Sequence, residues 1–198
     1  MDSKIEDIIQ SKISEKDCKI IFYYGKIVDR HKENRISLES LGPVVLNTLP
    51  PFYKFKRFTN EIFYNQAISK MKTSIRSSDS LLVYYDGSNS VDDFRDPFTT
   101  LFVHLPSKKC DLMIKCFNSK KKEIKSPIFE ELQREIIECK TSQWNLRCIK
   151  SKNKSEILLY EVNVEVKDVF CIKSLLFDLF DDVFCKKKQE DDREDPWI

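Results

Sequence analysis

Glycine is scarce in this 198-residue sequence, and its three residues, Gly25, Gly42 and Gly87, lie far apart. A phosphate-binding loop needs several glycines at a strand-to-helix turn, because the backbone N–H groups must approach the phosphates closely. No such cluster occurs in this sequence. We therefore expect the chain to bind neither ATP nor a dinucleotide, and we expect no other cofactor.

Closely spaced metal ligands are also missing. The two histidines, His31 and His104, are isolated, and no two cysteines form a CxxC pair. Zinc sites usually take their ligands from such closely spaced pairs. An acidic cluster, formed by Asp92, Asp93 and Asp96, lacks the glycine and glutamate spacing of a calcium loop. We predict no metal site and no catalytic residue.

Long apolar segments are absent, and so is a strong excess of charge. No run of 18 apolar residues occurs, and the first residues carry charges where a signal peptide would be apolar. Lys and Arg number 34 against 32 Asp and Glu, so the bulk charge does not indicate nucleic-acid binding. The seven cysteines have irregular spacing, which is typical of reduced thiols in the cytosol or nucleus. We expect a soluble intracellular protein with no membrane contact.

Hydrophobic periodicity indicates both strands and helices. Strands are predicted at 18–28, 52–58, 81–85, 98–105, 110–117, 144–149 and 156–166. The strands at 98–105 and 110–117, and those at 144–149 and 156–166, are joined by short polar turns and predict two antiparallel hairpins. Helices are predicted at 3–14, at 60–77 with Thr59 or Asn60 as the cap, from Ser126-Pro127 through Cys139, and at about 168–187.

These elements predict an α+β fold. We expect a mixed or antiparallel sheet of about six to seven strands, with helices packed on it and a long amphipathic C-terminal helix. The whole of residues 1–187 forms one domain, with an N-terminal helix at 3–14, a core at 18–166 and the C-terminal helix at 168–187. Residues 188–198 form a charged tail.

The predicted C-terminal helix carries more apolar surface than one face of a sheet covers. Its second apolar stripe is displaced from the first, and it is either an interface with a partner or the buried side of a central helix. We expect the partner contact to be made by Phe177, Phe180, Phe184, Leu176 and Val183.

The order of elements resembles the transducer domain of the topoisomerase VI B-like proteins that act in meiotic recombination. The similar features are Leu49-Pro50-Pro51 before an aromatic and basic strand, the helix through Ser74-Ile75-Arg76, the later strands, and the helix at 168–187. Short members of that family lack the ATP-binding half, in agreement with the missing glycine motifs. The resemblance covers about residues 45–187.

This resemblance implies a non-enzymatic role in the nucleus. The chain would be a subunit of the complex that forms meiotic DNA double-strand breaks. It would bind and orient a topoisomerase-VI-A-like catalytic subunit through the C-terminal helix, act with other double-strand-break proteins, and contact DNA only indirectly. One alternative is a small metal-free hydrolase or phosphodiesterase with His31 or His104 as general base. Another is a generic α+β adaptor.

Overall fold

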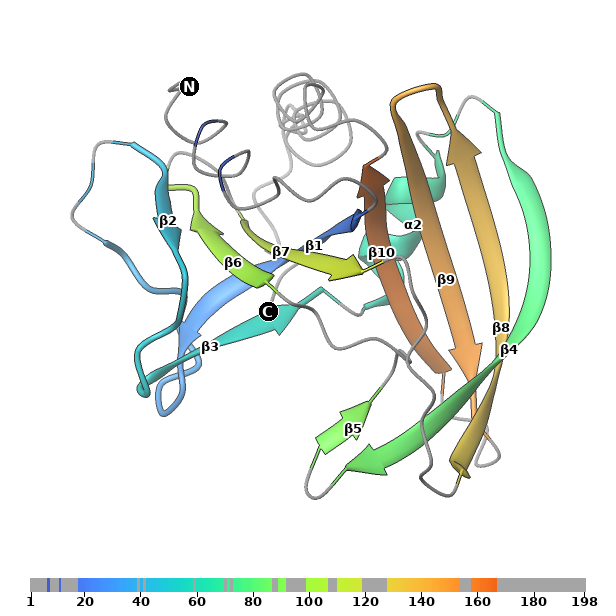
Figure 1. The fold of residues 1–198 in the computed structure, drawn as a ribbon, viewed down its shortest axis with the longest axis horizontal. Coiled ribbons are helices and arrows are strands. Elements are labelled where there is room, and N and C mark those ends of the chain that lie inside the picture. Colours follow the sequence, from blue (N-terminus) through green and yellow to red (C-terminus); the bar gives the residue numbers. More distant parts are fainter. Residues whose placement is uncertain are drawn as a thin grey trace.

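The computed structural model describes residues 7, 11, 18–38, 40, 42–58, 60–69, 71, 73–86, 89–91, 99–106, 110–118, 128–153 and 158–166. In these ranges ten strands form one sheet, with the helix α2 beside it (Figure 1). The strands are β1 (Cys18–Asp29), β2 (Val44–Leu46), β3 (Tyr53–Arg57), β4 (Ile75–Asp86), β5 (Asn89–Val91), β6 (Thr99–His104), β7 (Asp111–Asn118), β8 (Ile128–Lys140), β9 (Trp144–Lys152) and β10 (Leu158–Val166), and α2 is Glu61–Ser69.

The sheet is antiparallel throughout and has β1 near its centre. Its order is β2-β6-β7-β1-β10-β9-β8-β4-β5, and β3 pairs only with β1. One side of β1 pairs with β7. The other side pairs first with β10, at Ile20 to Tyr23, and then with β3, at Gly25 to Asp29. The apolar run Ile20 to Tyr24 thus lies on a strand that is paired on both sides, as is typical of strands that are apolar on both faces.

The two faces of the central strands differ in chemistry, and we call them the helix face and the charged face. The helix face lies against α2 and is apolar. Phe63 of α2 contacts Tyr24 of β1, with ring centroids 6.1 Å apart, and Tyr64 contacts Tyr160 of β10 at 5.1 Å. The cap is Asn60, whose Oδ1 accepts a hydrogen bond from the Phe63 N–H at 2.8 Å. The main hydrophobic core therefore lies between α2 and the sheet.

A smaller apolar cluster lies on the opposite side of β1, beside the charged side chains described below. Tyr23 and Met113 pack there with Phe55 and Phe102, whose ring centroids are 6.0 Å apart. The ring of Phe55 lies directly over Gly25. A Cβ at position 25 would come within 2.7 Å of this ring and 2.3 Å of the Lys56 carbonyl oxygen. The absence of a side chain at Gly25 is what lets β3 approach β1.

Replacing Gly25 by alanine should therefore destabilise the fold. The Lys56 carbonyl belongs to a strand paired with β1 and cannot move easily, and overpacking of this kind costs about 1–3 kcal/mol. Urea denaturation followed by tryptophan fluorescence measures the change. Lys26→Ala on the same strand is the control, because it removes a partly exposed side chain without a clash. An unchanged urea midpoint for Gly25→Ala would contradict this packing.

The expected α+β class is wrong. The described residues form a mostly antiparallel sheet of ten strands with one short helix packed on it, instead of six to seven strands beneath several helices. The segment from Ser126-Pro127 through Cys139 was expected to be helical, yet β8 runs from Ile128 to Lys140 between β4 and β9. Leu132 and Ile136 are four residues apart, a spacing that shares one face in a strand as well as in a helix. Backbone pairing on both sides of β8 decides for the strand.

The helix predicted at 60–77 is also too long. It ends at Ser69, and β4 begins at Ile75, whose side chain is exposed. Both predicted hairpins are confirmed as β6–β7 and β9–β10. Of the helix at 3–14, only Asp7 and Ser11 are described, and both are helical. The helix at 168–187 and the tail at 188–198 lie outside the described residues. No helix in the described ranges is long and apolar enough to cross a membrane.

Candidate functional site

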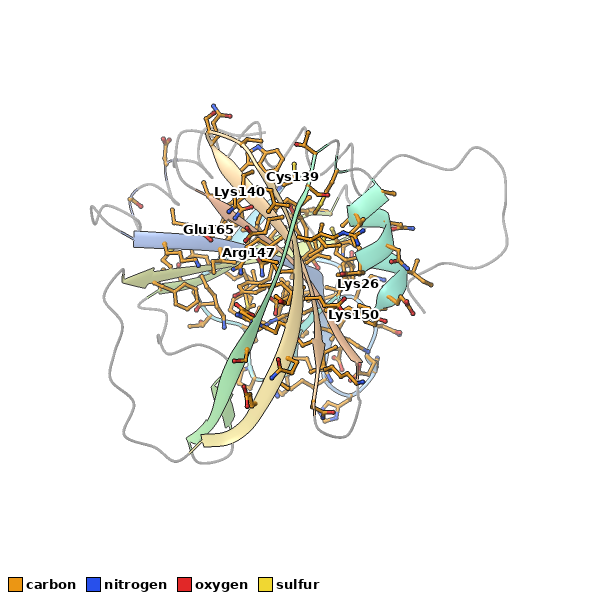
Figure 2. All side chains as sticks on the ribbon, turned by 90° about the vertical axis from the view of Figure 1, so that its right-hand side faces the viewer. Lys26, Cys139, Lys140, Arg147, Lys150 and Glu165 are labelled. Carbon is orange, nitrogen blue, oxygen red and sulfur yellow. The ribbon has the colours of Figure 1, made fainter. Side chains whose placement is uncertain are left out.

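Charged and amide side chains collect on the face of the central strands that is opposite α2. Alternate residues of a strand point to the same face, and β10 places Glu161, Asn163 and Glu165 there. In Figure 2, Lys140, Arg147 and Glu165 lie together, and Lys150 lies on the side of α2. The charged face comprises Lys19, Tyr23, Arg57, Lys115, Glu138, Lys140, Asn145, Arg147, Glu161, Asn163 and Glu165.

The strand register sets which of these side chains are neighbours. Glu165 on β10 stands opposite Asn145 on β9, and Asn163 stands opposite Arg147. On the next strand, Arg147 stands opposite Glu138 of β8. Directly opposite residues on one face have Cβ atoms about 5 Å apart. The three strands thus hold carboxylates, amides and cations in one compact array.

Glu138 is the most enclosed of the ion-paired carboxylates in this array. Its oxygens contact Arg147 Nε at 3.0 Å and Lys140 Nζ at 2.9 Å. Burial alone would raise the pKa of Glu138, but the hydrogen bond from Lys140 and the charge of Arg147 outweigh it and hold the pKa below its usual value. Glu138 is therefore ionised at neutral pH and holds two cations at once.

The other two carboxylates each contact a cation from a strand on the far side of β10. Glu165 Oε2 lies 3.2 Å from Lys19 Nζ of β1, and Glu161 Oε2 lies 3.6 Å from Arg57 Nη1 of β3. The Arg57 guanidinium also stacks over the Tyr23 ring at 4.6 Å. These contacts tie β10 to both β1 and β3.

Positive charge exceeds negative charge on this face. Three carboxylates, Glu138, Glu161 and Glu165, stand against five cations, which gives a local charge of 5 − 3 = +2. The five cations are Lys19, Arg57, Lys115, Lys140 and Arg147. A concave or partly buried surface with excess positive charge raises the local concentration of anions. The face is therefore suited to an anion that carries several charges.

Two amide oxygens on the same face lack a hydrogen-bond partner. The Nδ2 of Asn163 donates to Glu161, and the Nδ2 of Asn145 donates to Glu138 at 3.4 Å. The Oδ1 atoms of both residues are buried and unpartnered, and the only other such side-chain atom among the described residues is Nε2 of His104. Leaving a buried acceptor unsatisfied costs about 1–3 kcal/mol, so such an atom indicates a bound water or ligand.

A second polar cluster lies where the β6–β7 hairpin meets the loop after β1. Asp111 is fully buried, and its carboxylate accepts hydrogen bonds from the Arg35 guanidinium, the His104 ring, and the backbone N–H groups of Ile27 and Leu105. Ile27 belongs to β1, Arg35 to the loop after it, and His104 and Leu105 to the end of β6, while Asp111 itself begins β7. The cluster therefore joins four segments and stabilises the fold.

The structure does not bring the two histidines together. His31 is exposed in the turn after β1, and the His104 side chain is only 2% exposed against Asp111. No hydrogen bond or ion pair joins the two rings within the described residues. Nor does any group of three or more His, Cys, Asp and Glu side chains in the described ranges come close enough to hold a metal ion.

Several cysteines lie in the core, whereas the predicted partner-contact residues lie outside the described residues. Cys110, Cys116 and Cys148 are buried as small core residues, and burial raises the pKa of the Cys148 thiol to about 12. The predicted partner-contact residues Phe177, Phe180, Phe184, Leu176 and Val183 lie outside the described residues, as do Asp92, Asp93 and Asp96.

The array on the charged face was not recognised in the sequence, although one signal was present. The strand predicted at 156–166 has apolar residues at alternate positions, which places Glu161, Asn163 and Glu165 together on its other face. Lys19 and Arg57 carry no comparable signal, because only the pairing of β1 with β10 and β3 brings them to β10.

Comparison with known proteins identifies the fold. No family model and no curated protein sequence matches the chain. Two solved structures of the S. pombe Pct1 RNA triphosphatase are similar to it. The first, in complex with the Spt5 CTD, has a TM-score of 0.66 at 12% identity and covers 90% of this chain and 84% of its own. The second, the enzyme alone, has a TM-score of 0.67 at 11% identity and covers 92% and 86%.

These comparisons overturn the non-enzymatic role that the transducer resemblance implies. Two solved structures that share this fold are those of an RNA triphosphatase, so the meiotic double-strand-break subunit is wrong as the leading function. The kinship with topoisomerase VI B-like proteins and the expected topoisomerase-VI-A-like partner stay predictions that no comparison tests.

Proposed function

We propose that the chain is a phosphohydrolase that removes the terminal phosphate from the 5′-triphosphate end of RNA. The observation that carries this proposal is the charged face, where five cations and three carboxylates gather on neighbouring strands. A triphosphate is an anion of the size and charge that such an array binds. The RNA triphosphatase activity stated for the structures with this fold supports the same substrate.

The cations would bind the phosphates by changing partners. Arg147 and Lys140 now contact Glu138, and Lys19 contacts Glu165. Arginine and lysine bind phosphate oxygens through short, charge-assisted hydrogen bonds, and arginine does so through two parallel bonds. A triphosphate that replaces the carboxylates keeps these cations paired and adds negative charge where the array has an excess of positive charge.

The displaced carboxylates can then serve the reaction. A water oxygen forms a bond to the terminal phosphorus, the bond from that phosphorus to the bridging oxygen breaks, and the water proton passes to a carboxylate. Glu161 and Glu165 flank the centre of β10 and are the candidates for this proton acceptor. Lys19, Arg57 and Arg147 would stabilise the charge on the phosphate oxygens and the leaving diphosphate. The products are inorganic phosphate and RNA with a 5′-diphosphate.

Release of labelled phosphate tests the proposal. The purified chain is mixed with RNA that carries a labelled terminal phosphate at its 5′ end, with and without Mg²⁺, because nucleotide phosphates usually bind this ion. We expect release of labelled phosphate, and its loss in the double variant Glu161→Gln, Glu165→Gln. Glu135→Gln on the helix-face side of β8 is the control. Absence of both hydrolysis and RNA 5′-triphosphate binding would refute the proposed function.

The expected nuclear location is part of this proposal. An enzyme that acts on the first nucleotide of new transcripts must meet them where they are made. Fluorescence microscopy of the tagged chain tests the location, and exclusion from the nucleus would contradict it.

Replacing Glu138 by glutamine should strengthen anion binding. The carboxylate competes with a phosphate for Arg147 and Lys140, and its removal frees both cations. We expect tripolyphosphate to bind on the order of threefold to tenfold more tightly, as measured by isothermal titration calorimetry. Because the hydrogen bond from Lys140 and the charge of Arg147 hold the pKa of Glu138 below its usual value, lowering the pH is a poorer way to neutralise this carboxylate than the variant. Unchanged or weaker binding would show that phosphates do not take the place of Glu138.

A further inference from the structure

We infer that Asn145 and Asn163 bind the nucleoside that adjoins the phosphates, so that the site prefers a nucleoside triphosphate to free tripolyphosphate. This inference rests on the proposed function. It concerns the nucleoside of the substrate, which the contacts to the phosphates do not recognise. It is carried by the unpartnered Oδ1 atoms of the two asparagines.

Both asparagines are held in place by their donor groups. Asn163 donates to Glu161 and Asn145 donates to Glu138, and both residues are at least nine-tenths buried. These bonds fix which end of each amide carries the oxygen, because a carboxylate accepts from Nδ2 and repels Oδ1. The two unsatisfied atoms are therefore acceptors, and each needs a donor.

A phosphate chain cannot supply that donor. The oxygens of an ionised polyphosphate accept hydrogen bonds, and so they would meet the amide oxygens with like partial charge. The group beside the phosphates in a nucleotide does carry donors, namely the ribose hydroxyls and the N–H groups of the base. The shared chemistry that fits the two asparagines is thus an O–H or N–H donor next to a polyphosphate.

The register places these acceptors beside the phosphate-binding cations. Asn163 stands opposite Arg147, and Asn145 stands opposite Glu165, which pairs with Lys19. A triphosphate that engages Arg147 brings its next group to within about one residue spacing of Asn163. Phosphate binding and nucleoside recognition therefore use adjacent positions of the same two strands.

Comparison of three ligands tests the inference. Isothermal titration calorimetry at fixed ionic strength measures the affinities of tripolyphosphate, a ribonucleoside triphosphate and its 2′,3′-dideoxy analogue. Tripolyphosphate carries more negative charge than the nucleotide, so charge alone would make it the tighter ligand. We expect the ribonucleotide to bind about tenfold more tightly instead, because two hydrogen bonds to the asparagines contribute that factor. A weaker dideoxy analogue assigns the donors to the ribose, and an equal one assigns them to the base.

Variants separate the two asparagines from the cations. Asn163→Leu and Asn145→Leu remove the acceptor, and with it the N–H donor to the neighbouring carboxylate, with little change in size. Each should abolish most of the preference for the nucleotide, measured as the ratio of the nucleotide and tripolyphosphate affinities of the same variant. Asn47→Leu, at an exposed position away from the strands of the charged face, is the control, and thermal unfolding shows that each variant folds. Two further variants, Asn163→Ser and Asn145→Ser, keep an acceptor and provide a second test if a leucine variant fails to fold.

The outcomes distinguish this inference from the proposed function. If the chain binds tripolyphosphate and the nucleotide equally, or if both asparagine variants keep the preference, the inference is overturned and the proposed function stands. If neither ligand binds, both are overturned. Preference for the nucleotide that disappears with either asparagine supports the inference.

Discussion

Replacing Arg147 by glutamine should weaken tripolyphosphate binding by about tenfold to a hundredfold. Arg147 lies at the centre of the charged face, opposite Asn163 on one side and opposite Glu138 on the other. A charge-assisted hydrogen bond is worth about 1.5–3 kcal/mol, and glutamine supplies neither the charge nor the paired donors. Isothermal titration calorimetry measures the loss, and release of labelled phosphate from RNA should fall by at least the same factor.

Lys150 is a matched control for this experiment. It lies on the same strand as Arg147, three residues away, and points to the helix face, as Figure 2 shows. Lys150→Gln removes the same formal charge from β9, so a general effect of net charge would appear in both variants. We expect its affinity for tripolyphosphate to stay within about twofold of the unaltered chain. Equal losses in the two variants would place the anion elsewhere and refute the charged face as the site.

The sequence predicts local strand pairing well because each hairpin is encoded within a few residues. Alternating apolar residues on both sides of a short polar turn are enough to predict β6–β7 and β9–β10. The same alternation contains the polar residues Glu161, Asn163 and Glu165 on the other face of β10. The sequence thus predicts that Glu161, Asn163 and Glu165 share one face. A search for metal ligands or paired histidines does not find them, because none of the three is a histidine or part of a metal-ligand motif.

The overall sheet could not be predicted in the same way. The segment 126–139 begins with a cap residue and a proline that are typical of a helix start, and its apolar side chains four apart fit a helix and a strand alike. Backbone pairing with β9 on one side and with β4, more than forty residues earlier, on the other decides between them. Fold class therefore depended on contacts that no local pattern records, and the resemblance to a transducer domain followed from the wrong element order.

The cationic half of the site was hidden for a similar reason. Nothing in the sequence distinguishes Lys19 of β1 or Arg57 of β3 from the other basic residues of the chain. They reach Glu165 and Glu161 only because β1 pairs with β10 along one part of its length and with β3 along the next. This change of partner occurs at Gly25. The residue that must lack a side chain beneath Phe55 therefore also determines where Arg57 and Glu161 meet.

Replacing Asp111 by alanine should destabilise the fold by about 3–5 kcal/mol, the usual cost of removing one partner of a buried ion pair. The variant leaves the Arg35 guanidinium, the His104 ring and two backbone N–H groups without their acceptor. Because a domain is typically stable by only about 5–15 kcal/mol, we expect the melting temperature to fall on the order of 10 °C. Calorimetry and urea denaturation measure the change.

Asp79 provides the matched comparison, since it too forms a two-bond pair with an arginine. Its oxygens accept from Arg134 at 2.7 and 2.6 Å, but its side chain is 45% exposed, whereas that of Asp111 is fully buried. An exposed pair contributes about 0–1 kcal/mol because water and salt screen the charges. Asp79→Ala should therefore change stability little. A similar loss of unfolding free energy in both variants would mean that burial does not strengthen the Asp111 pair. The account of Asp111 as the residue that joins four segments would then be wrong. A large loss confined to Asp111→Ala would instead show that the β6–β7 hairpin is held to β1 mainly through this one carboxylate.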